Sequence, residues 1–272
     1  MTSKALLARA GKVGPAPLGA IVLALTGRAR LAATTMHANP PAPDGLDQAL
    51  EAAAQQAEHA TALLDAVRGA HPLTCRLTTR ALENRWGSMH AGMPGPESIG
   101  AAGDTAFEWA VSGVVGPALV PLLRSSLADA DGCVRRVAAA LLGHADVPAL
   151  GAELRAELAS ASATTRAGAL LAIGHAGKPA DVGPAAAALS DPDPAVKLAA
   201  IWALGMIGDP AAVQPLNRML EERDPTLRAA AALSLGQTES TEAIPALAAL
   251  LGEDGDARVR RAAAAALGQI DH

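Results

Sequence analysis

Two cysteines and seven histidines are the residues of this 272-residue chain best suited to bind a metal or act as nucleophiles. Cys75 and Cys133 lie in segments of apolar periodicity without a C-x-x-C pattern, so we expect buried free thiols in a reducing compartment. His144 and His175 each follow a glycine, 31 residues apart. Helices of adjacent repeats pack about 10 Å apart, whereas shared coordination needs roughly 2.0–2.1 Å to each nitrogen. We therefore interpret both histidines as turn residues.

A regular series of cations and carboxylates could also be taken for an ion-binding or catalytic row. A basic residue recurs at steps of 31, 31, 31 and 32 residues, and a residue typical of helix N-caps stands four positions before it. The basic residues are Arg135, Arg166, Lys197, Arg228 and Arg260, and the caps are Asp131, Ser162, Asp193, Asp224 and Asp256. Cap oxygens accept hydrogen bonds from the free amides of a helix start. The series therefore indicates capping and bonding between repeats.

The same register defines the elements that carry these residues. Eight positions after each basic residue stands a glycine, which suits a left-handed helix end; these are Gly143, Gly174, Gly205, Gly236 and Gly268. A second helix in each unit opens at Pro117, Pro148, Pro179, Pro210 and Thr241. Each unit is predicted to be two short helices, which are marginal alone and bury their apolar faces by stacking.

The segments DPDPAVKLAAIWALGMIGDPAAVQPLNRML (191–220) and RDPTLRAAAALSLGQTESTEAIPALAALL (223–251) resemble HEAT-like repeats of the phycobilisome-lyase type. The resemblance is specific over 117–272 and weakens upstream. It implies an all-α fold, a right-handed α-solenoid or armadillo-type superhelix of two-helix repeats. Proteins with such repeats mostly bind proteins or peptides along the concave face, which we assign to the second helices.

Some proteins with similar repeats are enzymes, and their sites can be checked against this sequence. Deoxyhypusine hydroxylase holds two irons with His-Glu pairs, but no histidine here is followed by Glu. DNA glycosylases need a basic groove, whereas residues 128–272 carry 12 Lys/Arg against 18 Asp/Glu, which disfavours nucleic acid. Nothing beyond the repeat type indicates a bilin lyase. We predict no catalytic residue, no metal ligand and no cofactor.

The chain divides into three parts by composition. Residues 1–45 form an N-terminal extension and Pro-rich linker, and the apolar run 16–25 is too short to span a bilayer. Residues 46–116 comprise a capping helix (46–70) and degenerate repeats with an irregular loop at 86–103, and residues 117–272 are the regular repeats. We therefore expect a cytoplasmic protein without a transmembrane segment.

The predicted binding residues fall into two groups. Arg124, Arg155, Asn217 and Arg218 lie on second helices, where the first two could clamp a carboxylate or an acidic peptide. The loop that breaks the repeat carries Trp86, Met89, His90 and Met93, residue types that adapt to varied partners.

Trp202 shares a repeat column with other apolar residues, and we predict that this column packs in the core. Its members in the other copies are Ala140, Leu171, Leu233 and Ala265.

These observations predict a non-catalytic scaffold that binds a protein or peptide. The alternative is an enzyme or enzyme subunit acting on a small molecule, with nucleic-acid binding as a third hypothesis. The sequence shows no second helix after the last capped one, so the open C-terminal end is a predicted surface for self-association.

Overall fold

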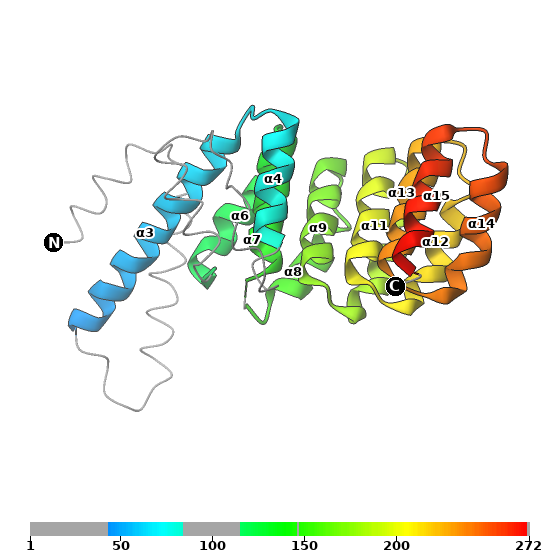
Figure 1. Cartoon of the computed structure of the whole chain (residues 1–272). Coiled ribbons are helices and arrows are strands. Elements are labelled where there is room, and N and C mark those ends of the chain that lie inside the picture. The colour runs from blue at the N-terminus through cyan, green and yellow to red at the C-terminus, as the bar shows by residue number, and fades with distance from the viewer. Residues whose placement is uncertain (1–42, 84–114, 146, 271–272) are drawn as a thin grey trace. The chain divides into compact units, whose positions relative to one another are not determined.

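The computed structural model of the chain describes residues 43–83, 115–145 and 147–270 (Figure 1). Every regular element in these residues is a helix, which confirms the predicted all-α fold class. No helix in these ranges is long and apolar enough to cross a membrane. The chain divides into two compact units, which we describe separately: residues up to 141 with 145–147, and residues 142–144 with 148 onward.

Unit 1 contains the long helix α3 (Pro43–Val67), α4 (Pro72–Glu83), α6 (Val120–Ser126) and most of α7 (Gly132–Gly143). α3 starts within the segment predicted to be linker, because Pro43 suits the first turn of a helix. The 3-10 turn Pro117–Leu119 packs against α3 and leads into α6. The core of the unit consists of leucines from these elements, which are fully buried: Leu63, Leu82, Leu119, Leu123 and Leu127.

The prediction of two free thiols is wrong, because Cys75 of α4 and Cys133 of α7 form a disulfide. Their Cα atoms lie 5.6 Å apart although 58 residues separate them in sequence. Both residues are buried. Apolar periodicity correctly placed each cysteine on an inward helix face, but only the packing of α4 on α7 brings the two faces together. The argument for a reducing compartment therefore loses its basis.

Unit 2 alternates capped first helices with shorter second helices. The first helices are α9 (Ala163–Ala176), α11 (Pro194–Ile207), α13 (Pro225–Gln237) and α15 (Ala257–Ile270). The second helices are α8 (Leu150–Glu157), α10 (Val182–Ala187), α12 (Val213–Met219) and α14 (Ile244–Glu253). Short 3-10 turns open the last three of these, at Pro179–Asp181, Pro210–Ala212 and Thr241–Ala243. Alanine and leucine from both series form one continuous core.

Gly174, Gly205 and Gly236 do not end helices, as their spacing predicted, but allow neighbouring first helices to approach. A Cβ on Gly236 would lie 2.8 Å from Ala266 Cα, and one on Gly174 would lie 2.9 Å from Ala203 Cα. The left-handed helix ends fall three residues later, at Gly177 (φ 59°) and Gly208 (φ 66°). Since both roles select glycine, spacing alone could not distinguish them.

Candidate functional site

The predicted helix caps are formed as expected. Asp193, Asp224 and Asp256 each accept a backbone amide hydrogen bond of 2.8 Å from the residue two positions later. The amide of Thr226 lowers the pKa of Asp224 below its ordinary value, because that bond stabilises the charged carboxylate. These carboxylates therefore serve as N-caps, each bound to an amide in the first turn of its helix.

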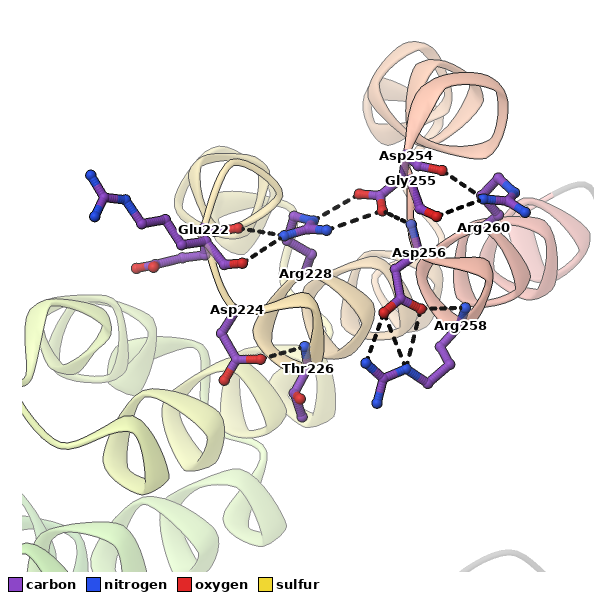
Figure 2. Close-up of polar contacts among 10 residues, drawn as sticks. Glu222, Asp224, Thr226, Arg228, Asp254, Gly255, Asp256, Arg258 and Arg260 are labelled. Atoms are coloured by element: carbon purple, nitrogen blue, oxygen red, sulfur yellow. Dashed lines mark hydrogen bonds and ion pairs between the residues drawn. The ribbon is translucent and has the colours of Figure 1, made fainter.

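Three of the five cations of the basic series join one repeat to the next. Arg166 binds Asp191 through Nε and Nη2 at 2.7 and 2.8 Å, and Lys197 binds Glu222 at 2.6 Å. Arg228 also binds Asp254 through Nε and Nη2 (Figure 2). These hydrogen bonds lower the pKa of the Asp254 carboxyl group. We call each of these cation–carboxylate pairs a rung. Because each charge in a rung is neutralised by its partner, these three cations have a structural role, as the sequence predicted.

One hollow of about 260 Å³ lies beside the first rung of unit 2. Its polar lining comes mainly from Arg166 and Asp191, which bind each other, and the rest is apolar: Leu158, Leu170, Pro184, Ala187, Ala188 and Val196, with Ser190 at the edge. A catalytic site needs polar side chains that point toward a bound substrate. In this hollow Arg166 and Asp191 bind each other instead.

His144 and His175 lie closer than the spacing argument allowed, with ring centroids 6.3 Å apart. His175 lies in the last turn of α9 rather than in a turn after it, and its ring meets Trp202 edge-on at 4.8 Å. Burial, followed by the charge of His144, lowers the pKa of His175 to about 3. His175 is therefore neutral at physiological pH and serves as a packing residue. Among the described residues no cluster of three or more His, Cys, Asp or Glu could hold a metal.

The predicted binding residues on second helices belong to three different helices. Arg124 belongs to α6 in unit 1, whereas Arg155 belongs to α8 in unit 2. Arg155 donates to Asp181 at 2.6 Å, and that carboxylate is 1% exposed, so its charge already has a structural partner. Asn217 is half-buried and Arg218 exposed on α12, two repeats after α8. The loop residues Trp86, Met89, His90 and Met93 lie outside the described residues.

The predicted core column around Trp202 is confirmed only in part in unit 2, because Trp202 and Leu171 pack against the core but other members of the column are exposed. Leu233 is 44% exposed, Trp202 and Leu171 are half-buried, and Ala265 is exposed. Leu198, one turn before Trp202 on α11, is 39% exposed. First helices are apolar around most of their circumference, so the sequence does not show which apolar column faces outward. In the sequence, the indication that this column is partly exposed was the size of Trp202 among smaller residues at the equivalent positions.

Comparison with known proteins supports the repeat assignment. The family model described as HEAT repeats matches residues 151–228 and 216–272. A similar solved structure is that of human deoxyhypusine hydroxylase in complex with glycerol, which is 18% identical and has a TM-score of 0.43, over 94% of this chain and 99% of that chain. A search of curated proteins found no match. Residues 151–272 of this chain therefore resemble HEAT repeats.

Proposed function

We propose that this chain is a scaffold that binds a protein or peptide along the face of the first helices of unit 2. The observation that carries the proposal is the apolar row of Leu171, Leu198, Trp202 and Leu233, which crosses α9, α11 and α13. Leu198 and Leu233 are two of only five large apolar side chains exposed in the described part of the chain. We call these four residues the apolar row.

The packing of the repeats explains why this face suits a ligand. Neighbouring first helices approach each other closely through Gly174, Gly205 and Gly236. Second helices of neighbouring repeats approach each other much less closely. A stack of repeats curves toward its more tightly packed side, so the first helices, rather than the second helices, supply the inner face in unit 2.

The chemistry of the two faces differs in the same direction. Most exposed positions of the second helices are small or polar, as at Gly183, Gln214 and Arg218, and the exceptions Ile244 and Leu251 both lie on the last of them, α14. The apolar row instead offers a tryptophan flanked by leucines, the kind of cluster that anchors interfaces once a partner excludes water. Covering a leucine or tryptophan side chain contributes on the order of 1–3 kcal/mol each. The expected ligand therefore presents apolar side chains, such as one face of a helix.

Site-specific photocrosslinking in the native host tests this proposal. A photoreactive amino acid is placed at Leu233 on the first-helix face or at Gln214 on the second-helix face. Both positions are exposed, so neither replacement disturbs the core. We expect a stoichiometric protein adduct from position 233 and none from position 214.

Substitution provides the matched control. Leu198→Ala with Leu233→Ala should weaken capture of that partner by tenfold or more, about 1.4 kcal/mol. Gln214→Ala with Arg218→Ala should leave capture unchanged. Loss of capture only in the Gln214→Ala, Arg218→Ala variant would place the site on the second helices. Equal capture by both variants would reject both faces.

A further inference from the structure

The charges of unit 2 are divided unequally between its two series of helices. The first helices α9, α11, α13 and α15 contain six Lys or Arg residues and no Asp or Glu. The carboxylates lie instead in loops, in 3-10 turns and on second helices, as at Asp191, Asp181 and Glu153. The helices that carry the apolar row therefore contribute only cations, although residues 128–272 have an excess of acidic residues.

Most of these cations are bound within the chain, and Arg261 on α15 is the exception. Three of the six form the rungs. Arg258 binds Asp256 at 2.7 Å, and Arg260 donates to two loop carbonyls (Figure 2). Arg261 is exposed and takes part in none of the ion pairs found in the described part of the chain. Its charge is therefore available to a ligand.

The repeat register places Arg261 on the same face as the apolar row. Arg261 follows the cation of its repeat directly, as Leu198 does on α11. Leu198 is 39% exposed although α11 packs against both α9 and α13. This position thus faces outward even where a first helix has neighbours on both sides. One turn after Arg261, the exposed Ala265 takes the place that Trp202 and Leu233 hold in their repeats. The apolar row therefore continues onto α15 as alanine beside a cation.

The spacing of the apolar row favours a helical ligand. Neighbouring first helices lie about 10 Å apart, so the row presents one large apolar side chain at roughly that interval, at Leu171, Trp202 and Leu233. A helix presents the same face again after seven residues, or about 10.5 Å. A strand presents the same face every two residues, or about 6.6 Å. A helix that lies across the first helices therefore matches the row, and a strand does not.

We propose that the ligand of the apolar row is an amphipathic helix of another protein that carries Asp or Glu about seven residues beyond the side chain covering Leu233, where the carboxylate binds Arg261. The inference rests on the proposed function and adds the charge of the partner to it. An acidic group here gains a charge-assisted bond and meets no carboxylate of the first helices. A basic group at the same place faces a like charge, which opposes binding.

Two designed peptides of 21 residues provide the probe. Both carry Leu at the first and fourth positions of two heptads, and the third heptad carries Glu in one peptide and Lys in the other at these positions. A second pair has the charged heptad at the other end, because the helix can lie in either direction. Each peptide is labelled with fluorescein and titrated with the full chain, and anisotropy reports binding.

The peptide with Glu should bind about fivefold more tightly than its partner with Lys at low salt, in at least one of the two pairs, as expected for an exposed ion pair. The difference should decrease at about 0.5 M NaCl through screening. The net charge of the chain is −5, so attraction to the chain as a whole would favour Lys. A preference for Glu therefore identifies a local cation.

Three variants of the chain locate the contact. Arg261→Glu should reverse the preference between the two peptides. Arg218→Glu makes the same change of charge at an exposed position of the second helix α12 and should retain the preference for Glu. Leu198→Ala with Leu233→Ala should weaken binding of both peptides tenfold or more, because it removes the apolar contact that they share.

The outcomes separate this inference from the proposed function. Equal binding of the Glu and Lys peptides, lost in Leu198→Ala with Leu233→Ala, would overturn the acidic partner and leave the apolar row in place. A preference for Glu that survives Arg261→Glu would also overturn it. Absence of binding by all four peptides up to about 1 mM would overturn the helical ligand, whereas photocrosslinking from position 233 tests the apolar row itself.

Discussion

Arg228 of α13 grips Asp254 with two parallel hydrogen bonds, Nε to Oδ2 at 2.7 Å and Nη2 to Oδ1 at 3.0 Å. Its third nitrogen donates to the carbonyls of Glu222 and Arg223. Asp254 in turn accepts the amide of Asp256 at 2.8 Å and so orders the start of α15. One pair of side chains therefore couples the end of one helix hairpin to the beginning of the next.

The coupling between Arg228 and Asp254 can be measured by a double-mutant cycle. With side chains 18% and 6% exposed and two parallel bonds, the pair should show a coupling of about 1 kcal/mol, the upper end for partly exposed ion pairs. Arg228→Met, Asp254→Asn and the double variant would be compared by urea unfolding. Arg218→Met on the exposed surface of α12 serves as the control. Additive effects of the two substitutions would contradict a direct interaction.

Two glycines in equivalent positions should respond in opposite ways to alanine. Gly236→Ala places a methyl group 2.8 Å from Ala266 Cα, so it should destabilise the chain by about 1–3 kcal/mol through overpacking. Gly268→Ala meets nothing within 4 Å and should stabilise α15 by up to about 1 kcal/mol, because alanine favours helix. Thermal unfolding of both variants checks the signs. The same sign for both would show that helix propensity, not close approach, determines the glycine positions.

The disulfide between Cys75 and Cys133 should make unit 1 sensitive to reductants. It closes a loop across a sequence separation of 58 residues, and the loss of loop-closure entropy in the unfolded chain corresponds to about 4 kcal/mol. Unfolding of the chain with and without dithiothreitol measures the effect. Cys75→Ser with Cys133→Ser should match the reduced chain and no longer respond to reductant. Two titratable thiols in chain denatured without reductant would contradict the pairing.

Burial of neutral His175 should make stability depend on pH on the acidic side. Its pKa is about 3 in the folded chain and 6.5 in the ordinary, exposed state. Between these pH values the unfolded chain binds a proton that the folded chain does not. The contribution of His175 is therefore complete above about pH 6.5 and decreases as the pH falls toward 3, by roughly 1 kcal/mol per pH unit.

His175→Phe isolates this effect, because it keeps a ring beside Trp202 and removes the titrating group. Denaturant unfolding between pH 7 and pH 5 should show a smaller loss of stability for this variant than for the parent chain. His71→Gln, at an exposed position of unit 1, should behave like the parent. An unchanged pH slope in His175→Phe would show that other groups account for the acid sensitivity.

The amino-acid sequence by itself determined the repeat, the pairing of short helices, the caps and the cations that join neighbouring repeats. These features are local or recur at a constant interval, so one chain compared with itself reveals them. Asp193, for example, caps α11 with an amide two residues away, a contact that needs no knowledge of the rest of the fold.

Only the tertiary structure decided which faces are exposed and which distant residues meet. Leu233 shares a column with buried Ala140, so its apolar character predicted a core position that unit 2 does not give it. Cys75 and Cys133 meet because α4 passes beside α7 at these residues, and Gly236 is needed because α15 packs closely against α13. Each depends on the distance between two helix surfaces, which periodicity along a single helix does not contain.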